Sequence, residues 1–193
     1  EVVITDALGC TNDIEITIEN PDTLLFDSFE VKDVLCFGDS NGVLNYSVSG
    51  GQSPYFYMLD SDLSKPLDDL SVGIYTIEVV DDNGCMIDSL FEVFQPQALT
   101  LGINSNQTQN ISCFNGSDGA ISLSANGGVF PFQYQIDGGV LQDQNLFDNL
   151  SSGDYELSVI DSNNCEASLS YNLTQPLQDF VISDYTLSDT LGY

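Results

Sequence analysis

Cysteine is the residue type with the clearest capacity for chemistry in this sequence, and its five copies are regularly placed. Cys36 precedes Cys85, and Cys113 precedes Cys165. We expect a disulfide within each pair, closing a loop of about 50 residues and contributing roughly 4 kcal/mol in the chain-entropy model. Cys10 would have lost its partner to truncation. The alternative is a set of reduced, buried thiols, whereas disulfides would place the protein outside the cytosol.

Carboxylates and amides lie before a glycine in the loop that follows the first cysteine of each pair. Asp39 and Asn41 occupy one loop and Asp118 occupies the other. Their oxygens are the hard ligands that Ca²⁺ prefers, so these three residues are candidate calcium ligands. Each loop alone offers fewer than the roughly six oxygens that calcium requires. Turn formation by Asp-Gly or Asn-Gly is the simpler interpretation, and it applies more strongly to Asp81 and Asp161.

The composition excludes several functions. Thirty acidic residues face two basic ones among 193, which gives a net charge of -28, and the sequence has no His, Arg or Trp. Such a charge repels nucleic acids, whose binding requires cations to meet phosphates. No apolar run approaches the roughly 20 residues that span a membrane. No pair of acids stands out as a catalytic pair, so we expect no catalytic residues and no cofactor other than calcium.

The candidate residues recur because the sequence contains two copies of one long pattern. Each copy passes in the same order through Cys-Phe, Gly-Gly, a Pro-aromatic run, Leu-x-x-Gly-x-Tyr, an aspartate turn before a cysteine, and Gln-Pro. We expect repeats at residues 22–97 and 98–177. Residues 1–21 would be the end of a preceding repeat, and residues 178–193 the start of a following one.

Short apolar runs separated by turn signals predict strands throughout the chain. They cover residues 24–31, 42–48, 55–59, 74–80, 86–94, 99–103, 120–125, 132–136, 155–160, 167–174 and 180–182. We therefore predict an all-β fold of tandem immunoglobulin-like β-sandwich repeats. Tyr75 and Tyr155 end the Leu-x-x-Gly-x-Tyr runs and predict a tyrosine corner, in which the hydroxyl bonds back to the preceding backbone.

The N-terminal tail shows its own strand pattern. Ile14, Ile16 and Ile18 alternate with polar residues, which predicts a half-buried strand with an acidic outer face. A two-stranded hairpin is marginal alone in water, so we expect it to have a packing partner.

The ordered pattern resembles the repeat of the SprB family of gliding adhesins of Bacteroidetes. The resemblance covers residues 22–176 and the tail at 1–21, with two departures: Asn164 replaces the usual Gly before the cysteine, and Phe132 replaces Tyr. It implies a very large extracellular, cell-surface protein, exported by type IX secretion and carried by the gliding machinery. The implied partners are neighbouring repeats of the same chain and a substratum polysaccharide or surface.

Three short Asp-Thr-Leu or Asp-Ser-Leu runs resemble the O-glycosylation signal of secreted Bacteroidetes proteins. Their candidate acceptors are Thr23, Ser89 and Thr190.

Three functions remain open from the sequence. The first is a structural and adhesive segment of a mobile surface adhesin. The second is a carbohydrate-binding module that holds a glycan with exposed aromatics such as Tyr55, Phe56 and Tyr57. The third is an accessory β-domain of a large secreted enzyme.

Overall fold

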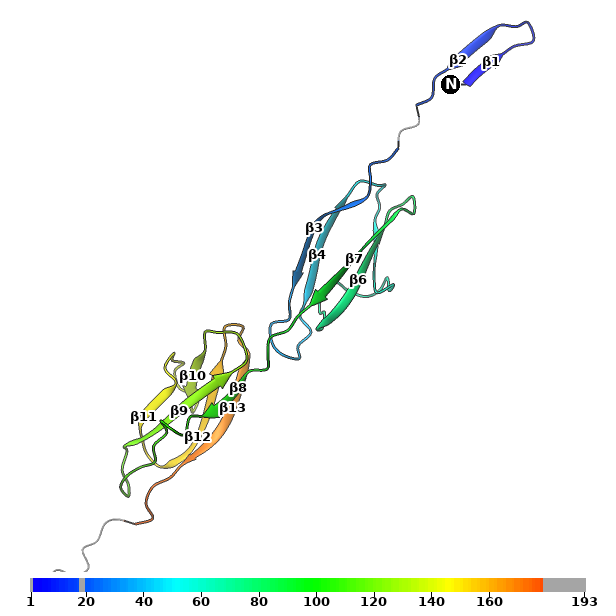
Figure 1. Cartoon of the computed structure of the whole chain (residues 1–193). Helices are drawn as coiled ribbons and strands as arrows, with labels where there is room; N and C mark the ends of the chain where they lie inside the picture. The colour runs from blue at the N-terminus through cyan, green and yellow to red at the C-terminus, as the bar shows by residue number, and fades with distance from the viewer. Residues whose placement is uncertain (1, 18–19, 179–193) are drawn as a thin grey trace, which may run out of the picture. The chain divides into compact units, whose positions relative to one another are not determined.

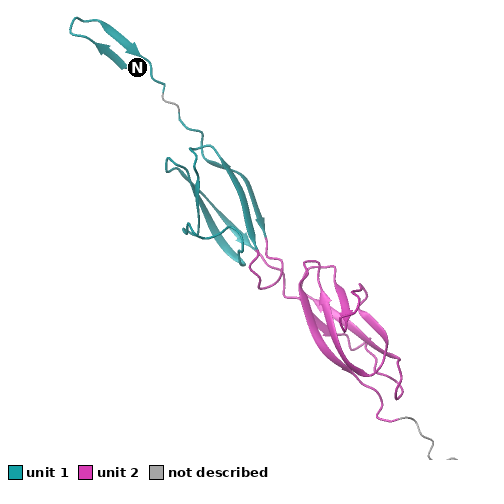
Figure 2. Cartoon of the chain, turned by 180° about the vertical axis from the view of Figure 1, so that it is seen from behind, with its two compact units in different colours: residues 1–32, 42–93 teal, residues 33–41, 94–193 magenta. Residues whose placement is uncertain are grey.

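A computed structural model describes residues 2–17 and 20–178, and its regular elements are all β-strands (Figure 1). The chain divides into two compact units (Figure 2). Unit 1 comprises Glu1–Lys32 and Gly42–Val93, and unit 2 comprises Asp33–Asn41 and Phe94–Tyr193. Within the described ranges, no helix is long and apolar enough to cross a lipid bilayer. The repeat boundaries at residues 22–97 and 98–177 stay predictions.

Unit 2 is a two-layer sandwich of six antiparallel strands. One sheet has the order β11-β9-β8 and the other has the order β10-β12-β13. The strands are β8 (Thr100–Ile103), β9 (Gly119–Asn126), β10 (Gln133–Ile136), β11 (Leu146–Leu150), β12 (Gly153–Ile160) and β13 (Glu166–Leu173). This pairing corresponds to the A-B-E and C-F-G sheets of an immunoglobulin-like domain.

Unit 1 repeats this arrangement in a reduced form. Its strands are β3 (Leu25–Lys32), β4 (Val43–Ser49), β5 (Phe56–Leu59), β6 (Gly73–Val80) and β7 (Met86–Val93). One sheet pairs β3 with β4, and the other has the order β5-β6-β7. A single bridge between Gly42 and Leu70 stands where unit 2 has β11. The predicted all-β, immunoglobulin-like fold is therefore confirmed.

Alternating side chains on the central strands build each core. In β6, Ile77 and Val79 are fully buried, and in β12 the same holds for Leu157 and Val159. Successive side chains of a strand point to opposite faces, so these pairs lie on the inner face of their sheet. In unit 2 the cluster that surrounds them comprises Ile111, Ile121, Leu123, Tyr134, Phe147 and Leu173.

Strand β11 is the element that the sequence pattern missed. It pairs with β9 through Leu146 and Phe147, and its register then shifts before Leu150. Asn149 within it has a φ of 56°, in the left-handed region. This irregularity breaks the apolar alternation by which a strand is recognised.

The N-terminal hairpin differs from the expected half-buried strand. Strands β1 (Val2–Thr5) and β2 (Thr11–Ile14) form a two-stranded antiparallel sheet. Ile14 and Ile16 are at least half exposed, because among the described residues no second layer covers this sheet. Ile18 and the predicted strand at 180–182 lie outside the described residues.

Candidate functional site

Cys10, Cys85 and Cys165 each end a turn that begins with an aspartate, and the three turns share the same hydrogen bonds. In turn 81–85, the Cys85 amide donates to Asp81 Oδ1 at 2.7 Å, and the Asp81 amide donates to the Cys85 carbonyl at 2.9 Å. Turn 161–165 makes both bonds, at 2.9 and 3.0 Å. Turn 6–10 makes both bonds as well, each at 2.9 Å. The aspartate therefore fixes the backbone that carries the cysteine.

The aspartates of the two later turns are buried carboxylates. Asp81 is 2% exposed and Asp161 is 4% exposed. Their second oxygens accept the amides of Gln52 at 2.9 Å and Val129 at 2.8 Å. Burial acts to raise the pKa of the Asp81 carboxyl, but donation by backbone amides, Gln52 foremost, holds its pKa below the ordinary value.

The second glycine of each Gly-Gly pair lies against one of these carboxylates. Gly51 and Gly128 have φ of +61° and +58°, and a Cβ on either would lie 2.6 or 2.8 Å from the Oδ2 of the aspartate in its unit. Glycine is the residue that accepts both the backbone conformation and the close approach. The glycine pair and the aspartate turn are thus one structural feature, although they are separated in the sequence.

The loop that carries the earlier cysteine also has one conformation in two places. In loop 34–41, the Leu35 amide donates to Asn41 Oδ1 at 2.9 Å, and in loop 111–118 the Ser112 amide donates to Asp118 Oδ1 at 3.1 Å. The Ser112 hydroxyl also donates to Asp118, and this bond leads the causes that lower the pKa of that carboxyl.

A glutamine side chain fixes the tip of each of these loops. Gln95 Oε1 accepts the Gly38 amide, and Gln175 Oε1 accepts the Asn115 amide, each at 2.8 Å. Gly38 and Asn115 both have positive φ, at 85° and 58°. The Gln-Pro landmark therefore marks the residue that holds the cysteine loop.

The disulfide pairing differs from the expected one. Cys36 is bonded to Cys165 within unit 2, with an S–S distance of 2.07 Å, a Cα–Cα distance of 5.6 Å and a sequence separation of 129. Cys10, Cys85 and Cys113 are free and exposed. The expectation of bonds within each repeat was wrong, because segment 33–41 leaves unit 1 between β3 and β4 and belongs to unit 2.

A side-chain hydrogen bond accompanies this disulfide. Asn163 Nδ2 donates to the Leu35 carbonyl at 2.8 Å. The residue before Cys36 is therefore held by turn 161–165, and the turn engages the backbone of the loop as well as its sulfur. A groove lined by Cys36, Phe37, Asp39, Ala98, Leu99, Asn164, Cys165 and Glu166 lies along this contact.

The calcium candidates are not assembled into a metal site. Asn41 and Asp118 close their own loops by accepting backbone amides, while the backbone amide of Asp39 donates to the Cys36 carbonyl at 3.2 Å. Across residues 2–17 and 20–178, no group of three or more His, Cys, Asp or Glu is placed to hold a metal ion. The structure supports the turn interpretation for Asn41 and Asp118.

The glycosylation candidates lie in different settings. Thr23 is exposed just before β3, and Ser89 is partly buried in the middle of β7. Thr190 lies outside the described residues. Modification of these residues stays a prediction.

The aromatic candidates divide between packing and exposure. Tyr55 donates its hydroxyl to the Gly50 carbonyl at 2.7 Å, and Tyr57 packs edge-on against Tyr46. Phe56 is 55% exposed, but the most exposed ring among the described residues is Phe130, at 80%. Phe130 was not among the sequence candidates, because exposure of a single ring leaves no periodic signal.

The tyrosine corners are confirmed in both units. Tyr75 donates its hydroxyl to the Ser71 carbonyl at 2.9 Å, and Tyr155 donates to the Ser151 carbonyl at 2.8 Å. Each bond fixes the crossover that enters the central strand of the second sheet, the position at which immunoglobulin-like domains have this feature.

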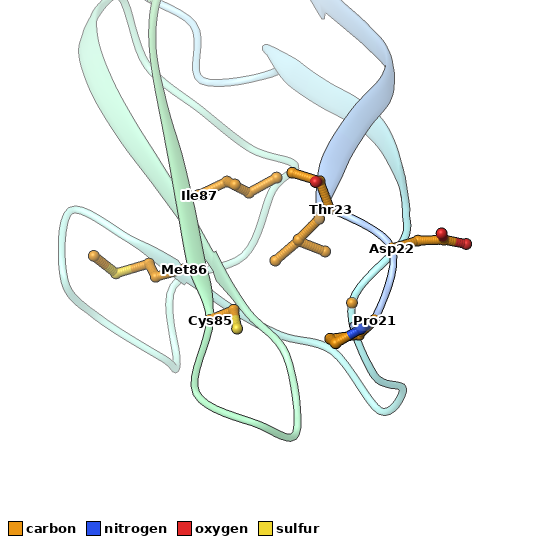
Figure 3. Close-up of a pocket in the computed structure, with 8 residues that line it drawn as sticks. Pro21, Asp22, Thr23, Cys85, Met86 and Ile87 are labelled. Carbon is orange, nitrogen blue, oxygen red and sulfur yellow. The ribbon is translucent and has the colours of Figure 1, made fainter. Parts of the chain in front are cut away.

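A pocket of about 210 Å³ lies beside the free Cys85 in unit 1. It is lined by Pro21, Asp22, Thr23, Leu24, Gly51, Cys85, Met86 and Ile87. Figure 3 shows two of the segments that line it, one with Pro21 to Thr23 and the other with Cys85 to Ile87, and Gly51 lines it from a third.

Two solved structures of other proteins are similar to parts of this chain. The first is the C-terminal 282-residue fragment of intimin in complex with the intimin-binding domain of the translocated intimin receptor. It is 14% identical, with a TM-score of 0.44, and the match covers 76% of this chain and 63% of that one. The second, from work on Dscam isoform specificity, is 11% identical, with a TM-score of 0.33, covering 76% and 46%. This chain therefore spans less than two thirds of each.

No curated protein matches the chain significantly. Two segments of the chain, residues 28–63 and residues 105–141, each match the SprB repeat. The matched segments begin within β3 in unit 1 and just after β8 in unit 2. The SprB repeat is a non-enzymatic domain type. The resemblance seen in the sequence is thus confirmed, because the SprB repeat is matched at two places in the chain.

Proposed function

We propose that this chain is a structural and adhesive segment of a large mobile adhesin on a bacterial cell surface. SprB repeats suggest a segment of a gliding-motility adhesin-like protein, and they are found in cell-surface proteins. Export by type IX secretion, attachment to the gliding machinery through other parts of the protein, and contact with a substratum polysaccharide belong to this proposal.

One observation carries the structural half of the proposal: apart from the cysteines and the turn asparagine, the features that the two repeats share stabilise the fold. The shared aspartate turns, glycine pairs, tyrosine corners and glutamine braces each bond to backbone or make room for such a bond. A repeat whose recurring residues maintain its own fold is suited to serial use, in which each unit contacts mainly its neighbours.

Two further observations support a surface location. The disulfide between Cys36 and Cys165 is typical of proteins that fold in an oxidising compartment. The net charge of -28 keeps the chain soluble and attracts divalent cations, which would bridge it to an acidic polysaccharide.

The test is an in-frame deletion of residues 22–177 in the host that makes the full protein. We expect attachment and gliding to weaken while export continues. Replacement by two unrelated immunoglobulin-like domains of equal length is the matched control, because it restores length without restoring these surfaces. Partial recovery would separate the structural role from the adhesive one. Normal attachment and gliding after the deletion would contradict the proposal.

Carbohydrate binding is the second candidate, and the exposed Phe130 favours it. Its ring packs edge-on against Phe132 at 5.8 Å and an interplanar angle of 83° while remaining 80% exposed. Such a supported ring offers an apolar face to a ligand at low entropic cost. Calorimetry of the chain with a polysaccharide panel tests this, with Phe130→Ala expected to abolish any binding. Val140→Ala, at an 88% exposed position, is the matched control.

A further inference from the structure

We propose that the pocket beside Cys85 receives the cysteine loop of another SprB repeat, and that Cys85 forms a disulfide with that loop. Loop 111–118, which presents the free Cys113, is the matching donor. This inference goes beyond the adhesive role and does not depend on it.

The occupied site in unit 2 identifies the kind of occupant. There the groove has two sides: Ala98, Leu99, Asn164, Cys165 and Glu166 on one, and Cys36, Phe37 and Asp39 of the incoming loop on the other. The Cys36–Cys165 bond joins the two sides.

The pocket in unit 1 has a side that matches the one with Ala98, Leu99 and Cys165 in unit 2, but it has no cysteine loop opposite that side. Thr23 and Leu24 correspond to Ala98 and Leu99: a Cβ on the first glycine of each Gly-Gly pair would lie 1.9 Å from the Thr23 carbonyl oxygen, or 2.0 Å from that of Ala98. Cys85 and Met86 correspond to Cys165 and Glu166 through the shared turn. Apart from these segments the pocket is lined by Pro21, Asp22, Gly51 and Ile87, none of which belongs to a cysteine loop.

Turn 81–85 is already in the conformation that holds the loop in unit 2. Its aspartate makes the bonds seen in turn 161–165, and Asn83 occupies the position of Asn163. Since Asn163 donates to the carbonyl before Cys36, Asn83 is placed to donate to the carbonyl before an incoming cysteine.

Loop 111–118 is likewise prepared to donate its cysteine. As in loop 34–41, the amide of the residue before the cysteine donates to a side chain at the end of the loop. The tip residue has positive φ, and its amide donates to a glutamine side chain. The Gly116 amide donates to the Cys113 carbonyl at 3.0 Å, as the Asp39 amide donates to the Cys36 carbonyl. Two preformed surfaces lose little conformational entropy on docking.

The bond requires an oxidant, which we take to be a small disulfide such as oxidised glutathione. The thiols of Cys85 and Cys113 each give up one proton and one electron as the sulfur–sulfur bond forms. The two electrons and two protons reduce the small disulfide to two thiols, through a mixed-disulfide intermediate. In a series of repeats, each cysteine loop would bond to the turn cysteine of the repeat that follows.

Cys10 is an internal control for this proposal. Turn 6–10 positions its cysteine in the same way, but Leu8 stands where Asn83 and Asn163 stand in the other turns. Cys10 is free and exposed, but its turn lacks the amide that engages the loop. Random oxidation would join Cys113 to Cys10 and Cys85 equally, whereas docking selects Cys85.

The experiment incubates the full chain in a glutathione redox buffer and maps disulfides by peptide mass spectrometry. We expect covalent oligomers in which Cys85–Cys113 links exceed Cys10–Cys113 links by about tenfold, the factor that 1.4 kcal/mol of docking energy provides. Cys85→Ala should reduce the covalent oligomers about tenfold, to the level that the Cys10–Cys113 links provide, and Asn83→Leu should reduce the preference to parity. Retention of the Cys36–Cys165 bond shows that each variant is folded. Equal links to Cys10 and Cys85 in the unmodified chain, or no Cys85–Cys113 link, would overturn the proposal.

Discussion

At the scale of single residues, the buried aspartates and the glycines opposite them define the repeat. Asp81 and Asp161 are among the few polar side chains that are buried in the described part of the chain, and each accepts several backbone amides. A buried carboxylate is costly unless it is fully hydrogen-bonded. The surrounding residues therefore have little freedom to vary.

Gly128→Ala should destabilise unit 2 more than Gly138→Ala does. Both residues have positive φ, but a Cβ at position 128 would lie 2.8 Å from an Asp161 oxygen, whereas position 138 has nothing within 4 Å. The backbone term costs about 1 kcal/mol in both variants, so the difference measures the displacement of the Asp161 carboxylate and of the Leu99 side chain, whose Cδ1 would lie 2.9 Å from the new Cβ. Chemical denaturation gives both values, and equal losses would show that the close approach is unimportant.

Tyr155→Phe should lower the free energy of unfolding by about 1 kcal/mol, because it removes the hydrogen bond to the Ser151 carbonyl while keeping the ring. Tyr171→Phe is the matched control, since the structure shows no hydrogen bond from that hydroxyl. The tyrosine corner would have no energetic role if the two variants were equally stable.

The stability of unit 1 should depend on the ionisation of Asp81. A pKa held below its ordinary value of about 3.9 means that the folded state favours the carboxylate. The stabilisation is therefore complete above the ordinary pKa and is lost as the pH falls through the lower pKa of the folded state. We expect the stability gap between the unmodified chain and Asp81→Asn to shrink on acidification below about pH 4. A gap independent of pH in denaturation series would contradict this.

At the scale of elements, segment 33–41 is the feature that the order of strands does not reveal. It joins β3 to β4 of unit 1, yet it belongs to unit 2 and is bonded there through Cys36. Its fixed conformation depends on Asn41, which joins the two ends of the loop by accepting the Leu35 amide, and on Gln95, which holds the tip at Gly38. A loop with such braces presents its cysteine in one geometry.

Replacing both Cys36 and Cys165 with Ala should destabilise the chain by about 2–4 kcal/mol, in the usual range for a native disulfide. The loop amides of Leu35 and Gly38 should still be protected from hydrogen exchange, because their acceptors Asn41 and Gln95 remain. Cys113→Ala is the control, since it occupies the matching loop position without a bond. If the control were equally destabilising, the loss would not come from the disulfide.

At the scale of the whole molecule, charge is the dominant property. With a net charge of -28, the acidic side chains repel one another. Lys65, one of the two basic residues, forms an ion pair with Asp60 at 2.6 Å. Self-repulsion of this kind opposes the compact state and is relieved by salt.

Calcium and magnesium should therefore stabilise the chain equally. The side chains of the calcium candidates Asn41 and Asp118 accept hydrogen bonds from backbone amides. We therefore expect calcium and magnesium to act alike, by screening the repulsion between carboxylates. Melting curves at matched concentrations of the two chlorides test this, with sodium chloride at equal ionic strength as the reference. A rise in melting temperature that is confined to calcium and reversed by a chelator would contradict the expectation.

Local patterns in the sequence determined the fold class, most strand positions, the tyrosine corners and the resemblance to SprB repeats. Alternation, turn residues and spacing are carried by neighbouring residues, and both copies carry the same signals. The turn role of Asn41 and Asp118 was available in the same way, because each bonds six residues back in its own loop.

Only the tertiary structure decided which cysteines bond. It also showed that each Gly-Gly pair lies against an aspartate about 30 residues further along the chain. The spacing of the cysteines predicted a bond between Cys36 and Cys85, because both belong to the same sequence repeat. The bond to Cys165 depends on where a loop goes after it leaves its strand, and nothing local records that path. The same holds for the missed strand β11, which is identified by its pairing with β9 and not by an apolar alternation of its own residues.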